Sequence, residues 1–174
     1  VDIGFRWVIL SLKRNPFPTR RLAFPMRHTV DPRQMNLFDP AEPFFSPATS
    51  KHVKSDWPGV FRAQMLHLMP ACELGEHFHP SLGCPTKELY SMAGAVFLKE
   101  ALNLTTLQMI HHYLTDASWQ YALNLNPMEV SLRKRTAERY LAVFAEDDLA
   151  TAVFHEVTTA VVAGLGVTSA TTCL

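Results

Sequence analysis

The clearest chemical signal in this chain of 174 residues is a run of cationic side chains toward its C-terminal end. Arg135 and Arg139 stand four residues apart with Thr136 beside them, and Arg133 and Lys134 precede the pair. On a helix, residues four apart share one face. Guanidinium groups bind phosphate oxygens and the acceptor edge of guanine, and a threonine hydroxyl can bond to either group. The pattern therefore fits a surface that contacts a nucleic acid.

A solvent-exposed helix face with ordinary ion pairs explains the same residues. Lys134 and Glu138 are four positions apart, and Arg135 and Glu138 are three apart, which are the spacings of weak surface pairs on helices. The residues by themselves leave a nucleic-acid surface and a solvated face equally open.

A second group of residues has the side-chain types of a zinc site. Its members are Cys72, His77, His79 and Cys84. Recurring zinc sites place paired ligands two to four residues apart at both ends, and this spacing does not. No bound metal is expected, so a small metal enzyme is the weakest alternative. His111 and His112 are neighbours on an expected helix and cannot face one another, so one should point to solvent.

Hydrophobic periodicity predicts the elements that would position these side chains. The longest helix is expected over Thr86–Leu102, which is apolar around most of its circumference and should therefore be central. Its narrow polar line consists of Lys87, Ser91 and Lys99. Trp57–Met69 should form the first helix and Asp148–Leu165 the last, stopped by Gly164 or Gly166. The inward face of the first helix should comprise Val60, Phe61, Met65 and Leu68.

Two short helices and the cationic helix are expected in between. Thr105 and Gln108 have the spacing of a capping box, and Asp116 is a suitable N-cap for the next helix. Asn126–Pro127 should end that helix, because proline lacks a backbone donor and disfavours helical geometry in its predecessor. Ser131 should cap the cationic helix. The apolar face of the cationic helix should comprise Ala137, Tyr140, Leu141 and Phe144.

Composition limits the class of protein without deciding its function. The 16 basic and 16 acidic residues give a formal net charge of zero, so total charge does not favour nucleic acid. The distribution is more informative, because the acidic group Glu146–Asp148 comes after the cationic run, seven residues beyond Arg139. Three cysteines at no framework spacing predict a reduced, cytoplasmic setting. No apolar run is long enough to predict a membrane span.

Three segments resemble the N-terminal domain of bacterial insertion-sequence transposases of the DDE type. They read Gly-Cys-Pro-Thr-Lys-Glu-Leu-Tyr (83–90), Trp-Gln-Tyr-Ala-Leu-Asn-Leu (119–125) and Arg-Lys-Arg-Thr-Ala-Glu-Arg-Tyr (133–140). Gln34–Asp39 resembles the opening segment of the same family, and the similarity extends over roughly residues 26–174. The chain departs from the family at Cys84, where arginine is usual, so no basic contact is expected at this position.

The resemblance implies a mainly α-helical bundle with a helix-turn-helix-like unit and an irregular N-terminal segment. It implies double-stranded DNA, the terminal repeats of an insertion sequence, as the partner of a nucleoid-associated protein. The residues expected at the DNA are Arg135, Thr136 and Arg139, with Arg133, Lys134 and Lys87 on flanking phosphates. The family's catalytic domain holds two divalent ions such as Mg²⁺ through three carboxylates. None of those carboxylates carries over to this chain, so neither a cofactor nor catalysis is expected of it alone.

Four segments are expected along the chain. Residues 1–25 should be a disordered extension, or alternatively a basic arm on DNA phosphates, and residues 26–56 an extended Pro-rich arm. Residues 57–166 should form the helical domain, and residues 167–174 the strand that leads to a catalytic domain. A second hypothesis is a protein-interaction module, in which apolar helices and Glu146–Asp148 build an interface with another copy or with a full-length transposase.

Overall fold

The computed structural model describes residues 27–34, 39, 41–146 and 148–164. The expected extension over 1–25, the expected strand over 167–174 and Gly166 lie outside these residues. Within them the chain is mainly helical, and the only β pairing is one isolated bridge between His28 and Glu88. The predicted mainly α class is confirmed for this part of the chain.

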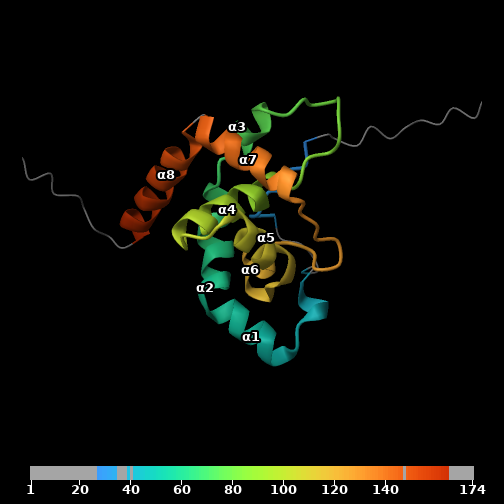
Figure 1. Cartoon of the computed structure of the whole chain (residues 1–174). Helices are drawn as coiled ribbons and strands as arrows, with labels where there is room; N and C mark the ends of the chain where they lie inside the picture. The colour runs from blue at the N-terminus through green and yellow to red at the C-terminus, as the bar shows by residue number, and fades with distance from the viewer. Residues whose placement is uncertain (1–26, 35–38, 40, 147, 165–174) are drawn as a thin grey trace, which may run out of the picture.

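Eight α-helices are linked by short turns in the described residues, as Figure 1 shows. They are α1 Pro47–Ser55, α2 Trp57–Val60, α3 Ala71–Glu76, α4 Leu89–Ala101, α5 Thr106–Thr115, α6 Ala117–Ala122, α7 Lys134–Glu146 and α8 Leu149–Gly164. The shorter elements are the 3₁₀ turns η1 Glu42–Phe44 and η3 Leu66–Leu68 and the π turn η2 Phe61–Met65. The predicted order between Pro85 and Phe144, one long helix, two short ones, a turn and the cationic helix, is confirmed.

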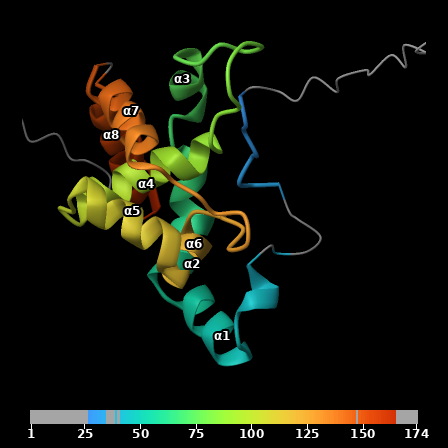
Figure 2. The same ribbon diagram turned by 45° about the vertical axis from the view of Figure 1, so that its right-hand side comes forward.

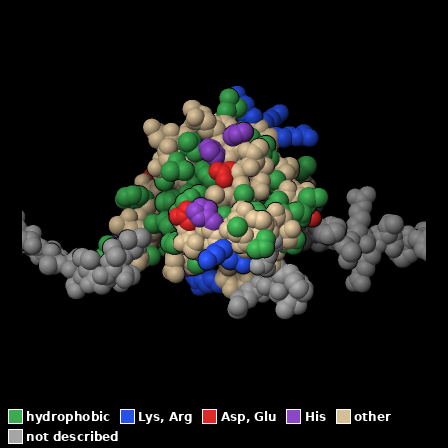
Figure 3. Space-filling view, turned by 90° about the horizontal axis from the view of Figure 1, so that it is seen from below, with side chains coloured by type: hydrophobic (Ala, Val, Ile, Leu, Met, Phe, Trp, Pro, Cys, Tyr) green, Lys and Arg blue, Asp and Glu red, His purple; other side chains and the backbone are tan. Residues whose placement is uncertain are grey.

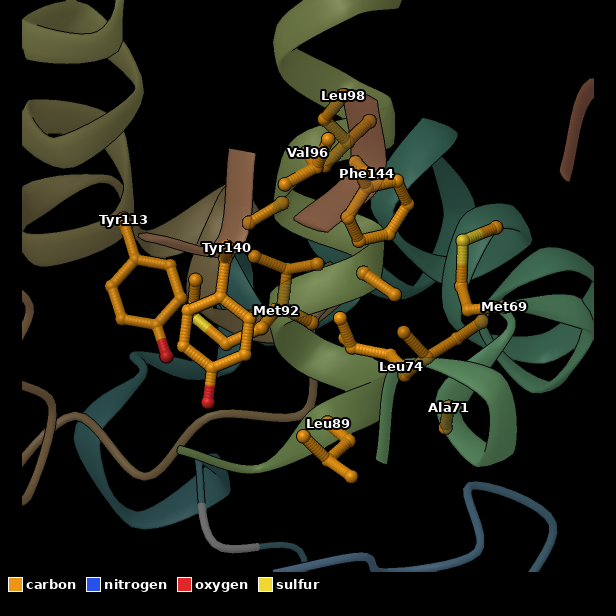
Figure 4. Packing of buried hydrophobic residues seen from close by; sticks show 14 of the residues in the cluster. Met69, Ala71, Leu74, Leu89, Met92, Val96, Leu98, Tyr113, Tyr140 and Phe144 are labelled. Carbon is orange, nitrogen blue, oxygen red and sulfur yellow. The ribbon is translucent and has the colours of Figure 1, made fainter. Parts of the chain in front are cut away.

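Helix α4 lies at the centre of the fold, as its apolar circumference predicted. It packs against α3, α5, α7 and η3, and it crosses the middle of the molecule in Figures 1 and 2. Ser91, on the predicted polar line, is 1% exposed, and its hydroxyl lies 2.7 Å from the Leu123 carbonyl oxygen that accepts from it. Leu102, by contrast, is exposed, because it follows the end of the helix. Figure 4 shows the side chains that pack around α4.

The first predicted helix has a different inward face from the one expected. Phe61, Leu66 and Met69 are buried, whereas Val60 is 56% exposed, so the prediction for Val60 is wrong. The reason is the π turn over Phe61–Met65, which accommodates more residues per turn than an α-helix. The spacing of five between Phe61 and Leu66 fits that wider turn, and a 3.6-residue period cannot anticipate it.

Part of the expected extended arm is helical, which corrects the prediction for residues 26–56. Helix α1 begins at Pro47, and the Ser46 hydroxyl accepts the Thr49 N–H as its N-cap. Serine followed by proline at the first helical position is a helix-start signal. Helix α3 was also not predicted, since it is a single short helix between Pro70 and the loop that follows.

Two of the three predicted helix starts are confirmed. Thr105 and Gln108 form the capping box, and the Asp116 carboxylate accepts the Ser118 N–H at 2.8 Å. Ser131 does not cap the cationic helix, because α7 begins at Lys134 and the Arg133 carbonyl accepts its first N–H bonds.

The predicted stop at Asn126–Pro127 is wrong by a few residues. Helix α6 ends at Ala122, and Asn124 follows in the left-handed region with φ 55°. The N–H groups of Asn124 and Leu125 bond to the carbonyls of Tyr121 and Gln120, which is the Schellman arrangement. Asn103 ends α4 in the same way, with φ 51°.

The apolar faces predicted for the last two helices are only partly buried. In α7, Ala137, Tyr140 and Phe144 are buried as expected, together with Val143. In α8, hydrophobic periodicity predicts that Leu149, Ala152, Val153, Val157 and Ala160 face inward. Leu149, Val153 and Val157 are buried, whereas Ala152 and Ala160 are exposed.

Candidate nucleic-acid interface

Helix α7 is held by its apolar face and leaves its cationic face at the surface. It packs against α4, α5 and α8, and Figure 2 shows it beside α8 on the edge of the molecule. The connection from α6 to α7 runs through residues 123–133. A standard helix-turn-helix joins its helices with three or four residues, and the connection here is longer, so α7 is positioned by its contacts with α4, α5 and α8.

Five of the six predicted site residues line one shallow cavity of about 320 Å³. They are Lys87, Arg133, Arg135, Thr136 and Arg139. We call this the basic cavity; its remaining lining is Phe78, Cys84, Pro85, Thr86 and Tyr140. Two segments about 50 residues apart in sequence meet here, one before α4 and one around the start of α7. The lining contains four cationic side chains and no carboxylate, so the cavity has a positive potential.

Arg139 is oriented by an aromatic ring that the sequence did not single out. Its guanidinium carbon lies 4.7 Å from the centroid of Phe78, and the Phe78 ring lies 5.1 Å from that of Tyr140. The Phe78 carbonyl accepts a hydrogen bond from Arg27 Nε at 2.7 Å. A guanidinium stacked on a ring keeps its in-plane donors available for a ligand.

Lys87 is fixed at the edge of the basic cavity by two hydrogen bonds. Its backbone N–H donates to the Tyr140 hydroxyl at 3.1 Å, and its Nζ donates to Ser131 Oγ at 2.7 Å. Burial raises the pKa of Tyr140, while the Lys87 N–H and the neighbouring Arg139 act in the opposite direction. The Tyr140 phenol is therefore neutral at physiological pH and anchors the Lys87 backbone as an acceptor.

Lys134 is separate from the other predicted residues. Its Nζ lies 3.6 Å from Glu138 Oε1 in an exposed i,i+4 pair, as the solvated-face interpretation predicted. The Arg135–Glu138 pair of that interpretation is absent from the ion pairs of the described residues, and Arg135 faces the basic cavity instead. The cationic helix thus carries both a solvated side and a cavity side.

Phe78 and Cys84 are two of the cavity residues that sequence analysis did not assign to the site. Phe78 is 7% exposed although it lies in a segment without regular structure. An aromatic residue between two histidines was the available signal, and it pointed equally well to a solvated loop. Cys84 places an uncharged thiol in the cavity wall.

The predicted histidine and cysteine groups take other roles. His79 Nδ1 accepts from the N–H of Leu82 at 2.9 Å. No group of three or more His, Cys, Asp or Glu side chains that could hold a metal ion occurs in the described part of the chain. His111 is exposed, as expected for one of the two neighbouring histidines, while His112 pairs with Asp116 at 3.1 Å and stacks on Trp119.

An apolar groove on another surface concerns the second hypothesis. It has a volume of about 520 Å³ and lies between α4, α7 and α8. Phe97, Phe144 and Phe154 line it, and Phe154 is 68% exposed. Viewed from the end where α1 lies, Figure 3 shows hydrophobic side chains at the surface between separate groups of Lys and Arg side chains.

Comparisons with known proteins identify no relative. No family model, no curated protein and no solved structure matches the chain. Among the described helices, none is both long and apolar enough to cross a bilayer. The geometry of the basic cavity therefore has to support any functional conclusion.

Proposed function

We propose that this chain binds double-stranded DNA through the basic cavity and the cationic side of α7, as the end-recognition domain of a transposase. The observation that supports the proposal is the convergence of Lys87, Arg133, Arg135 and Arg139 on one cavity without an acidic residue. The resemblance of three sequence segments to insertion-sequence transposases supplies the class of DNA, a terminal inverted repeat.

The start of α7 adds to the attraction for a phosphate. The first N–H groups of a helix have no intrahelical partner and carry a partial positive charge. The cavity lies at this end of α7, where Arg133 and Arg135 flank the first turn. Arginine forks bind phosphate oxygens in pairs, so two neighbouring phosphates of one strand are the expected ligands of this cluster.

Matched single substitutions on α7 test the proposal. Arg135→Ala and Lys134→Ala each remove one positive charge from adjacent, exposed positions of the same helix. Only Arg135 lines the cavity, so Arg135→Ala should weaken binding to an inverted-repeat duplex by about tenfold and Lys134→Ala by less than threefold. Fluorescence anisotropy at fixed salt measures both affinities.

Two duplexes distinguish recognition of the inverted repeat from binding to any DNA. One should contain the inverted repeat nearest to the reading frame, and the other the same bases in scrambled order. Equal affinity for the two duplexes at every salt concentration would contradict end recognition. Equal loss from Arg135→Ala and Lys134→Ala would show that the cavity has no special part in binding.

The apolar groove supports a second candidate function, a protein-interaction module. Exposed Phe154 beside Phe97 and Phe144 would be covered if another copy of the domain packed against α8. In that case the mass measured by light scattering should rise with protein concentration, and Phe154→Ser should abolish the rise. A mass that stays monomeric at all concentrations would exclude self-association.

A further inference from the structure

A second cavity adjoins the basic cavity and differs from it in charge. It has a volume of about 360 Å³, and its lining shares Lys87 with the basic cavity. We call it the polar cavity. Its charged lining residues are Lys87, Glu88 and Glu129, so it is slightly acidic where its neighbour is strongly cationic. An anion is therefore favoured in the basic cavity, and a neutral polar group is favoured in the polar cavity.

Tyr113 gives the polar cavity an unusual lining group. Its side chain is 2% exposed, yet its hydroxyl has no hydrogen-bond partner among the described residues. No buried side-chain nitrogen or oxygen of the described residues lacks a hydrogen-bond partner, so the Tyr113 oxygen is reached from the cavity and its hydroxyl is free to bond to a ligand there. In the view of Figure 4 the hydroxyls of Tyr113 and Tyr140 point in the same direction. Tyr140 lines the basic cavity and Tyr113 lines the polar cavity, so each cavity contains one of the two phenols.

Several groups that line the polar cavity are free to donate a hydrogen bond. Glu88 is already saturated, since its two oxygens accept from Val30 N, Tyr90 N and Ser91 N. The side-chain oxygens of Asn124 and Asn126 accept from Arg62 at 2.7 Å and from Met128 N at 3.1 Å. Their amide N–H₂ groups have no acceptor within the described part of the chain.

Tyr113 can also donate. Burial raises the pKa of its phenol above the ordinary value, with Glu88 and Tyr140 adding to the rise, so the hydroxyl keeps its proton at physiological pH. Together with the two asparagine amides and Lys87 Nζ, this makes a cavity that fits a neutral ligand rich in acceptor oxygens.

We propose that the polar cavity binds the carbonyl-bearing base of an unpaired nucleotide, such as thymine, whose phosphate lies in the basic cavity. The proposal rests on the proposed function, because Lys87 would stand between the base and its phosphate. Lys87 is held in this position by the hydrogen bond that its Nζ donates to Ser131 Oγ at 2.7 Å. Thymine has two carbonyl acceptors for the donors of the cavity and carries no charge, in keeping with the acidic surroundings.

Thymidine 5′-monophosphate and the intact 174-residue chain provide the test. The base protons should receive magnetisation from the protein in saturation-transfer NMR, and calorimetry should give the Kd. Tyr113→Phe keeps the ring and removes only the unpaired hydroxyl, so the fold should be retained. The Kd should then rise about three- to tenfold, as for the loss of one hydrogen bond. Tyr90→Phe is the matched control, because Tyr90 lines a different cavity, and its Kd should equal that of the parent.

Three results would overturn the proposal. They are an unchanged Kd in Tyr113→Phe, an equal rise in Tyr90→Phe, and complete displacement by inorganic phosphate with no saturation transfer to the base. Duplex binding measured on the same samples separates the two hypotheses. Normal duplex binding with no effect of Tyr113→Phe rejects only the base site. Tyr113-dependent nucleotide binding without any duplex binding supports the base site and rejects the proposed function.

Discussion

At the scale of single residues, polar side chains that join distant segments are more informative than the charged surface. Arg62 donates to Asp39 at 2.8 Å and to Asn124 at 2.7 Å, and its guanidinium carbon lies 4.6 Å from the Tyr121 ring centroid. One side chain therefore ties the N-terminal segment to the end of α6. The basic cavity adjoins the polar cavity that contains Asn124, so this contact also supports the proposed site.

Removal of Asp39 tests that contact. Asp39→Ala leaves Arg62 with less than a fifth of its side chain exposed and without its carboxylate. A lost hydrogen bond between charged groups costs about 1.5–3 kcal/mol, so the free energy of unfolding should fall by that amount. Urea unfolding monitored by circular dichroism measures it. Lys51→Ala, at an exposed position on α1, serves as the control and should change the free energy of unfolding by less than about 0.5 kcal/mol.

At the scale of elements, the π turn decides which side of the first helix faces the core. Phe61 is 3% exposed and Val60 is 56% exposed. Phe61→Ala should therefore lower the free energy of unfolding by about 3–5 kcal/mol, whereas Val60→Ala should leave it within about 0.5 kcal/mol. Thermal or urea unfolding compares the two variants. A cost of more than about 1 kcal/mol for Val60→Ala would contradict the π-turn register.

The helix stops allow a second prediction at this scale. Asn103 has φ 51°, where a residue with a Cβ is strained unless it is Asn, Asp or Gly. Asn103→Ala should lower the free energy of unfolding by about 1 kcal/mol, and Asn103→Gly should leave it unchanged or raise it slightly. The order of the two melting temperatures is the measurement. Equal melting temperatures would show that α4 does not end in a left-handed residue.

At the scale of the whole molecule, a protein of zero net charge would bind DNA only through its local distribution of charge. Four cations line the basic cavity. Each neutralised phosphate contributes about −0.9 to the slope of log association constant against log salt, so a slope of about −3 to −4 is expected. Replacing both Arg135 and Arg139 by Ala should make it shallower by about 2. Anisotropy titrations between low and moderate salt give the slope, and an unchanged slope would mean that other cations neutralise the phosphates.

The sequence by itself determined the helical class, the central position of α4 and the start signals of α5 and α6. Local physics decides these features: hydrophobic periodicity sets which face is buried, and a capping box or an Asp N-cap satisfies backbone donors within a few residues. The cationic face of α7 also followed from spacing alone. The predicted stop at Asn126–Pro127 was wrong, because Asn124 takes a left-handed backbone conformation and ends α6 earlier.

Tertiary structure alone decided which cations share a cavity. Lys87 and Arg133 are far apart in sequence, and packing of α4 against α7 brings them to one wall, while the neighbouring Lys134 turns to Glu138. A helix repeat fixes the face on which a side chain lies, but the residues opposite that face depend on contacts that are distant in sequence. The cationic residues could therefore be named from the sequence, whereas their arrangement around two adjoining cavities could not.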